Sequence, residues 1–119
     1  MKILVFGSNG LVGKSIVRRF NSSSDKYTVI ESTRNDTDLF SYKETSKKIG
    51  ESNPDIVIIA AAKVGGIYAN NTQRFSFIIE NLKISMNIFE SLVDFPNVKI
   101  VNIYLEKNII IIIILKIVK

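Results

Sequence analysis

Short apolar runs recur along this chain and alternate with longer segments of helical periodicity. The runs predict four strands, at Lys2–Phe6, Tyr27–Glu31, Asp55–Ala60 and Val98–Ile103. The segments between them predict helices over Leu11–Phe20, over Phe40–Ile49, which Gly50 ends, and over about Thr72–Val93, where apolar residues recur at steps of three and four. Strands that alternate with helices and are apolar on both faces are typical of a covered parallel sheet. We therefore expect an α/β, doubly wound parallel sheet truncated to about four strands, and right-handed crossovers predict the strand order 3-2-1-4.

The composition excludes several kinds of chemistry. The 119 residues suffice for one domain and include neither cysteine nor histidine, which excludes disulfides, thiolate zinc sites and catalysis by Ser-His-Asp or Cys-His groups. We expect no metal site. The net charge of the chain is +5, and its sequence contains no run of five or six like charges. We therefore expect no nucleic-acid partner, although a mildly basic surface suits a phosphate-rich ligand. The longest apolar run, Ile109–Leu115, is far shorter than the roughly 20 residues that span a bilayer, so we expect no membrane partner and a cytoplasmic location.

A glycine-rich segment lies between the first predicted strand and the first predicted helix. Its residues follow the pattern G-x-x-G-x-x-G, as Gly7-Ser8-Asn9-Gly10-Leu11-Val12-Gly13. The first glycine permits a tight turn, the second lets the backbone approach a pyrophosphate, and the third lets the helix pack close to the sheet. The free N–H groups of the helix N-terminus would then face the phosphates. The segment predicts a Rossmann-like dinucleotide site, although three glycines near a turn are often only a turn.

Two charged residues near the end of the second predicted strand bear on which dinucleotide is bound. Glu31 lies 18 residues after Gly13, near the position where an acidic residue would hold a ribose 2′-hydroxyl, as NAD requires. Arg34 could instead pair with the 2′-phosphate of NADP. Both side chains could also be solvated loop charges. We favour NADP through Arg34 and keep NAD as the alternative.

A run of small residues follows the third predicted strand, in the string AAAKVGGIYANNT that begins at Ala60. Small residues at the carboxyl end of a parallel strand leave room for a ligand. This string, the glycine motif and Ser32-Thr33-Arg34 resemble the GDP-L-fucose synthases of the NAD-dependent epimerase/dehydratase family, which are extended short-chain dehydrogenase/reductases. The stretch Asn81–Asn87 is similar to that family's asparagine-bearing helix. The resemblance covers residues 2 to about 103 and corresponds to the amino-terminal part of such an enzyme.

The resemblance implies a function and a set of binding residues. The family epimerises GDP-4-keto-6-deoxy-mannose at C3 and C5 and then reduces it at C4 with NADPH, so the implied substrate is a nucleotide sugar. Full-length members often form homodimers. Gly7 to Gly13 would bind the pyrophosphate, Arg34 the 2′-phosphate, and Asp38 and Leu39 would lie near the adenine. The residues that would line the dinucleotide side of the crevice are Ala60, Ala61, Ala62 and Lys63.

The chain departs from the family's pattern in ways that bear on catalysis. Asn9 stands where the family often has a basic residue, which weakens the expectation of NADP. The family's Tyr-x-x-x-Lys pair, in which the tyrosine is the general acid, has no counterpart, since Tyr104 and Lys107 are three residues apart. The epimerising cysteine and histidine are absent too. We therefore assign no catalytic residue and favour an inactive part of such an enzyme over a non-catalytic dinucleotide-binding module, with an RNA-binding protein as a weaker alternative.

The last residues break the alternation of strands and helices. Residues 108–119 are only Asn, Ile, Leu, Lys and Val, with six consecutive isoleucines at Ile109–Ile114. A terminal strand, a disordered tail and a shifted reading frame would each explain this composition, and we favour the shifted frame. We accordingly divide the chain into a partial NAD(P)-binding domain, 1–103, and an aberrant Ile/Lys-rich tail, 104–119. An uncharged β-branched run favours aggregation, so deletion of 104–119 is expected to improve solubility.

Overall fold

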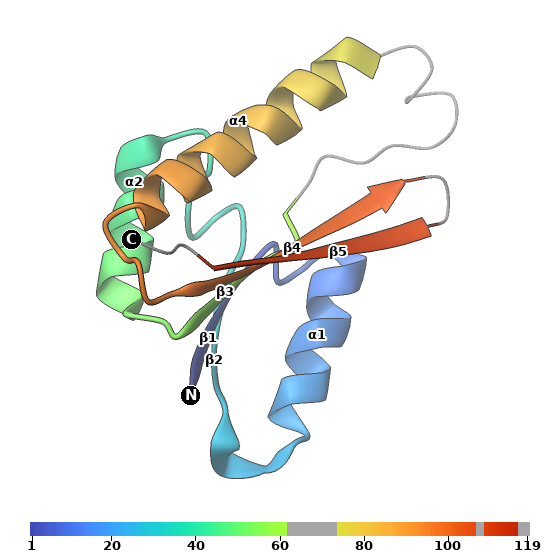
Figure 1. Ribbon diagram of the computed structural model, residues 1–119. Coiled ribbons are helices and arrows are strands. Elements are labelled where there is room, and N and C mark those ends of the chain that lie inside the picture. Colours follow the sequence, from blue (N-terminus) through green and yellow to red (C-terminus); the bar gives the residue numbers. More distant parts are fainter. Residues whose placement is uncertain (62–73, 107–108, 117–119) are drawn as a thin grey trace.

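The computed structural model describes residues 1–61, 74–106 and 109–116, and Figure 1 shows one sheet with helices on both faces. The strands are β1 (Lys2–Phe6), β2 (Thr28–Ser32), β3 (Ile56–Ile59), β4 (Lys99–Glu106) and β5 (Ile109–Lys116). The α-helices are α1 (Leu11–Asn21), α2 (Tyr42–Ser52) and α4 (Arg74–Leu92), and a short 3₁₀ turn covers Ser24–Lys26. In the described part of the chain, no helix is long and apolar enough to cross a membrane.

The sheet confirms the predicted fold class but not the predicted strand order. The five strands lie in the order β2-β1-β3-β4-β5, with the first four parallel. The order 3-2-1-4 is wrong because β3 pairs with β1 and β4, and not with β2. The most apolar strand, β3, thereby takes a central place with both faces covered. The half-exposed β2 lies at the edge, where a polar face remains in water.

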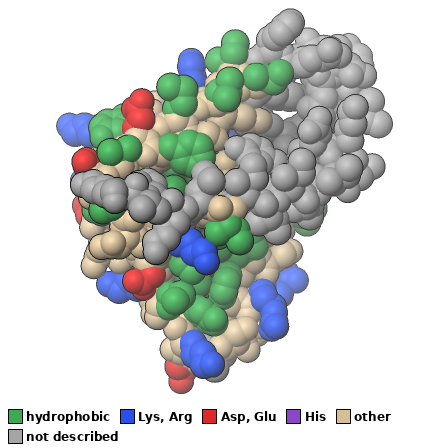
Figure 2. All heavy atoms as spheres, viewed as in Figure 1, with side chains coloured by type: hydrophobic (Ala, Val, Ile, Leu, Met, Phe, Trp, Pro, Cys, Tyr) green, Lys and Arg blue, Asp and Glu red, His purple; other side chains and the backbone are tan. Residues whose placement is uncertain are grey.

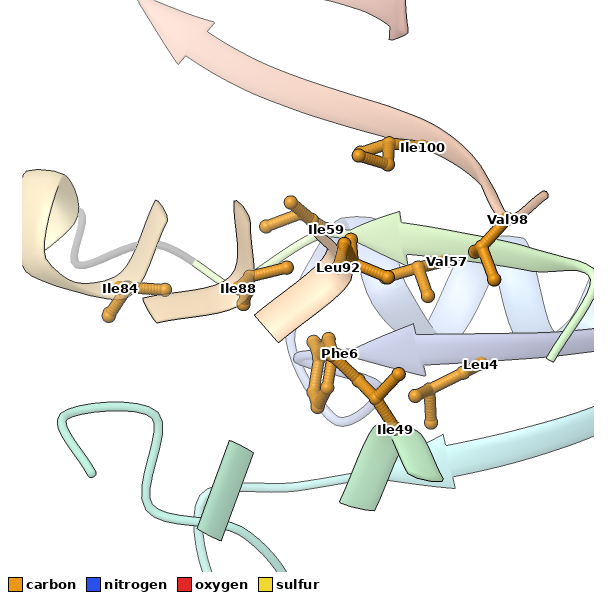
Figure 3. Close-up of a cluster of buried hydrophobic side chains, with 10 residues drawn as sticks. All are labelled: Leu4, Phe6, Ile49, Val57, Ile59, Ile84, Ile88, Leu92, Val98 and Ile100. Carbon is orange, nitrogen blue, oxygen red and sulfur yellow. The ribbon is translucent and has the colours of Figure 1, made fainter. Parts of the chain in front are cut away.

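The reversal of winding after β2 separates the helices between the two faces of the sheet. α1 packs on one face, where Val17 meets Ile3, Val5 and Ile58. α2 and α4 cover the other face (Figure 1), and Ile49 of α2 closes over Leu4 and Phe6. Figure 3 shows this second cluster, to which α4 contributes Ile84, Ile88 and Leu92. The crossover through α1 runs from β1 to β2, whereas the crossovers through α2 and α4 run in the opposite direction across the sheet. Right-handed crossovers that run in opposite directions place their helices on opposite faces.

The bounds of α2 differ from the prediction at both ends. The Ser41 hydroxyl accepts a hydrogen bond from the Glu44 N–H at 3.2 Å, which starts the helix after Phe40. Gly50 lies inside the helix and does not end it. The end comes at Ser52, because Asn53 adopts the left-handed conformation (φ 46°, ψ 56°) and Pro54 follows. Asn53 therefore ends the helix, a role that the sequence predicted for Gly50.

Residues 109–116 form part of the sheet. β5 runs antiparallel to β4, and the pairing extends from Ile109 opposite Glu106 to Lys116 opposite Lys99. The predicted boundary after residue 103 therefore falls inside β4. Of the three explanations for the isoleucine run, the structure shows the terminal strand. The shifted frame and the gain in solubility on deletion remain predictions.

Candidate functional site

The carboxyl ends of β1, β2 and β3 meet at one edge of the sheet. Phe6 is in register with Ser32 on one side and with Ile59 on the other. The Ser32 carbonyl accepts hydrogen bonds from the N–H groups of Gly7 at 2.9 Å and Ser8 at 3.2 Å. The chain winds in opposite directions on the two sides of β1, so this edge is the switch point of the fold. In doubly wound sheets ligands bind at that point.

Two of the three motif glycines are required by the protein's own packing. Gly7 has φ +80°, and a Cβ there would lie 2.6 Å from the Ala61 nitrogen. A Cβ on Gly13 would lie 1.9 Å from the Gly7 carbonyl oxygen. The first glycine thus lets β1 turn against the end of β3, and the third lets α1 approach that turn, as the motif predicts.

Gly10 differs from Gly7 and Gly13, because no described residue fills the space that a Cβ would occupy. A Cβ there would meet only the Gly7 oxygen, at an ordinary distance of 3.5 Å. Its φ of −75° is also open to any residue. Steric packing therefore does not explain this glycine. Close approach of a ligand to the backbone, which the motif predicts at this position, does explain it.

The N-terminus of α1 offers unpaired hydrogen-bond donors. Gly10 is the N-cap and supplies no side-chain acceptor, and the first turn contains no acidic residue. Among the described residues, the N–H groups of Leu11, Val12 and Gly13 have no acceptor, since the first helical bond joins the Lys14 N–H to the Gly10 carbonyl at 2.8 Å. The Leu11 side chain is 86% exposed, so this helix end is open to solvent. Free donors together with the helix dipole favour an anion here.

A buried hydroxyl lies in the turn that precedes the helix. Ser8 is only 2% exposed, and its Oγ has no hydrogen-bond partner among the described residues. A buried polar group without a partner costs free energy, and such groups are uncommon in proteins. A ligand oxygen bound at the helix N-terminus would give this hydroxyl a partner.

The loop after β2 forms a compact polar turn that carries Arg34. The Asp36 carboxylate accepts hydrogen bonds from the Thr33 N–H at 2.9 Å and the Thr33 hydroxyl at 3.0 Å. The buried Ser32 hydroxyl donates to the Thr37 hydroxyl at 3.1 Å. Arg34 is exposed at the tip of this turn, and Glu31 is exposed on the strand before it. Both candidates for dinucleotide specificity therefore remain accessible to a ligand.

Asp36 makes this turn sensitive to acid. The backbone N–H and then the hydroxyl of Thr33 lower the pKa of Asp36 below its ordinary value of 3.8, with a smaller contribution from Lys48. A carboxyl whose pKa is lowered by folding stabilises the fold above its unfolded pKa. That contribution is lost as the pH falls through the lowered pKa, below about 4. The turn that presents Arg34 is therefore held in place at neutral pH.

The other predicted site residues lie beside the same edge. The Asp38 carboxylate accepts a hydrogen bond from the Phe40 N–H at 3.0 Å, and Leu39 packs against the core. The Leu39 carbonyl accepts a hydrogen bond from the Asn87 amide at 2.8 Å, which ties α4 to the predicted adenine segment. Ala60 and Ala61 are half-buried beside Gly7, and Ala62 and Lys63 lie outside the described residues.

Asn87 was not among the residues that the sequence assigned to the site. The only signal available was the similarity of the stretch Asn81–Asn87 to the family's asparagine-bearing helix. Its contact with Leu39 joins residues 48 positions apart in the chain. A contact between such distant residues becomes apparent only when the packing of α4 beside α2 is known.

A model of the NAD-dependent epimerase/dehydratase family matches residues 3–104. The chain belongs to this family. The match includes the glycine loop, β2 and β3, and most of β1 and β4, so the family membership and the fold support one another. It also confirms the resemblance that the glycine motif and the AAAKVGGI string indicated.

Relatives within the epimerase/dehydratase family are sugar-nucleotide enzymes by name. The chain is 41% identical over 90 residues to GDP-L-fucose synthase 1 of Arabidopsis thaliana, covering 76% of this chain and 28% of that one. It is 40% identical over 89 residues to the GDP-L-fucose synthase of Sinorhizobium fredii, covering 75% and 28%. Among solved structures, the GDP-mannoheptose C4 reductase of Campylobacter jejuni with NADP bound has a TM-score of 0.74 at 30% identity, covering 85% and 32%. The chain thus spans about a third or less of the length of these relatives.

Proposed function

We propose that this chain is the dinucleotide-binding part of a GDP-L-fucose synthase-type enzyme and that it binds NADP(H) at the β1–α1 turn. The observation that carries the proposal is the unpaired set of donors at that turn, namely three free N–H groups and the buried Ser8 hydroxyl. The pyrophosphate would lie against the residues from Gly7 to Gly13. NADP in the related C4 reductase structure supports a nicotinamide dinucleotide as the ligand.

The choice between NADP and NAD is proposed to depend on Arg34. Its guanidinium is exposed beside the carboxyl end of β2, where the 2′-position of the adenosine ribose would lie. Glu31 is exposed close by and would favour the 2′-hydroxyl of NAD. We propose NADP because a planar guanidinium can bind a phosphate through two hydrogen bonds.

Replacing Arg34 by alanine is expected to weaken NADPH binding about tenfold or more and to leave NADH binding unchanged, because only NADPH carries the 2′-phosphate. Parallel calorimetric titrations of the wild-type chain and the variant with both dinucleotides would measure this. Lys47→Ala, which removes an exposed cation from α2, is the matched control. An equal loss for NADPH and NADH would show that Arg34 does not bind the 2′-phosphate.

The relatives' names extend the proposal to a substrate. The reaction implied for a complete enzyme is epimerisation and NADPH-dependent reduction of GDP-4-keto-6-deoxy-mannose, in the cytoplasm. By itself the 119-residue chain contains no Tyr-x-x-x-Lys pair to supply the proton. We therefore propose that this chain binds the dinucleotide without turning over the sugar. Because the chain lacks the Tyr-x-x-x-Lys pair, a second candidate function is a dinucleotide-binding module with no catalytic role.

Titration of the purified chain with NADPH, followed by an assay of NADPH oxidation with GDP-4-keto-6-deoxy-mannose, tests the proposed function. We expect saturable binding of one NADPH per chain and no oxidation. Addition of the nucleotide sugar should tighten NADPH binding if the chain contributes to a substrate site, and should have no effect if it is only a binding module. Failure to bind either NADPH or NADH would overturn the proposal, and turnover by the chain alone would refute its second part.

A further inference from the structure

Asn87 of helix α4 is a polar residue among apolar neighbours. Ile84 and Ile88 beside it are buried in the core (Figure 3). The solvent-facing side of α4 exposes hydrophobic side chains (Figure 2), with Leu82 and Met86 both 56% exposed. By its helical position Asn87 lies at the margin between these two sides, where it is half-buried. An amide withdrawn from water costs free energy unless its polar atoms find partners, so the partner of Asn87 is informative.

The Asn87 side chain reaches the segment that joins β2 to α2. Its Nδ2 donates a hydrogen bond to the Leu39 carbonyl at 2.8 Å. Every other hydrogen bond that the described residues make in this segment joins residues within five positions of one another. The bond from Asn87 is therefore the one that ties this segment, by hydrogen bonding, to a distant element of the described chain.

Leu39 is held at two points, and its N–H is left free. Its side chain packs against the core cluster beneath α2 and α4, and its carbonyl accepts the bond from Asn87. Among the described residues its N–H has no acceptor. The preceding residue, Asp38, is exposed, and only Oδ1 of its carboxylate accepts the bond from the Phe40 N–H. A free donor and a free acceptor thus lie on adjacent residues.

This donor and this acceptor match adenine and do not match hypoxanthine. Adenine presents an amino group, which donates, next to the ring nitrogen N1, which accepts. The Asp38 carboxylate can accept from the amino group, and the Leu39 N–H can donate to N1. In hypoxanthine an oxo group takes the place of the amino group and N1 carries a proton, so both roles are reversed. Discrimination between the two bases therefore depends on how this segment is oriented.

We propose that Asn87 is a positioning residue for the base of the dinucleotide: by holding the Leu39 carbonyl, it orients the Leu39 N–H and the Asp38 carboxylate to select adenine. Asn87 acts through Leu39 and needs no contact with the ligand. Groups that are already oriented before binding lose less conformational freedom when the ligand arrives, so the bond from α4 contributes to affinity as well as to selectivity. This inference rests on the proposed function and deepens it.

Calorimetric titrations of the full chain with NADPH and with its hypoxanthine analogue test this role. We expect the wild-type chain to bind NADPH about tenfold more tightly than the analogue, the effect of mismatched hydrogen bonds at the base. Asn87→Asp keeps nearly the same shape but replaces the donor by a charged acceptor, and Asn87→Leu removes the polar group. In each variant the preference for NADPH should fall to about twofold or less, because Leu39 is no longer held.

Ser91→Ala is the matched control, because the buried Ser91 hydroxyl donates its hydrogen bond within α4, to the Asn87 carbonyl at 2.7 Å. We expect this variant to retain the preference for NADPH. A general loss of stability weakens the binding of both dinucleotides alike, so the ratio of the two affinities separates positioning from stability.

Circular dichroism verifies the fold of each variant, and either folded Asn87 variant suffices for the test. A preference for NADPH that survives in Asn87→Asp or Asn87→Leu, or that Ser91→Ala abolishes as well, would overturn the inference. Equal affinity of the wild-type chain for NADPH and the analogue would overturn this inference alone. Failure of the wild-type chain to bind either one, or NADH, would overturn the proposed function and this inference with it.

Discussion

Replacing Gly13 with alanine is expected to lower the free energy of unfolding by about 3 kcal/mol and to remove NADPH binding. The new Cβ would lie 1.9 Å from the Gly7 carbonyl oxygen and within 3 Å of two further backbone atoms. Backbone atoms cannot rotate away as a flexible side chain can, so α1 must move off the turn. That movement would pull Val17 from its contact with the sheet and displace the N–H groups proposed to hold the phosphates.

Gly50→Ala is the matched control for this prediction, because Gly50 is also a helical glycine. A Cβ there would meet only the Phe95 ring, at 3.7 Å. We expect Gly50→Ala to raise the free energy of unfolding by up to about 1 kcal/mol, because alanine has a higher helix propensity than glycine. Urea denaturation of both variants at one protein concentration measures the two changes. A Gly13→Ala variant as stable as the wild type would show that α1 does not approach the turn as closely as described.

Gly10→Asp is expected to separate binding from stability. Aspartate is a favoured N-cap residue, and a Cβ at Gly10 meets no close neighbour, so the free energy of unfolding should be unchanged or higher by a few tenths of a kcal/mol. Dinucleotide affinity should fall about 100-fold or more. The carboxylate would take up the N–H groups that the phosphates are proposed to use, and it would repel their charge.

Gly10→Asn distinguishes these two causes of the lost affinity. Asparagine has nearly the same shape and also caps helices, but it carries no charge. We expect it to weaken NADPH binding less than aspartate does. Calorimetric titration of both variants, with denaturation curves for each, supplies the measurement. Wild-type affinity in Gly10→Asp would contradict a phosphate site at the α1 N-terminus.

The sequence predicted best the part of the fold that local interactions determine. β1 has the predicted bounds, and α1 extends one residue beyond the prediction. Both predictions succeed because the apolar run of β1, the glycines and the apolar stripe of α1 are all contained within the first 20 residues. The family resemblance rested on the same region and on the string after β3. Both signals depend on neighbouring residues, which a sequence displays directly.

The strand order could not be read from local patterns. Whether β3 lies beside β1 or beside β2 depends on the direction in which the chain crosses after α2, and either direction permits a right-handed crossover. The polar character of β2, with Thr28 and Glu31 exposed, was the available signal that it belongs at an edge. The end of α2 was misjudged for a related reason, since glycine and asparagine both adopt the left-handed conformation and Asn53, not Gly50, does so here.

The two faces of α4 show a further limit of periodicity. Its outer residues recur at helical spacing from Ile79 to Val93, yet the core contains Ile84, Ile88 and Leu92 instead. Both stripes satisfy the same rule, and only the packing shows which one is buried.

The central proposal is that a dinucleotide binds with its phosphates at the amino end of α1. An NMR titration of the ¹⁵N-labelled full chain with NADPH tests this most directly, because each backbone N–H reports on its own surroundings. We predict saturable shifts that are largest for the amides of Ser8 and of Gly10 to Gly13, with smaller shifts at Thr33 and Arg34. Saturable shifts confined to other parts of the chain, or no shifts at all, would contradict the account.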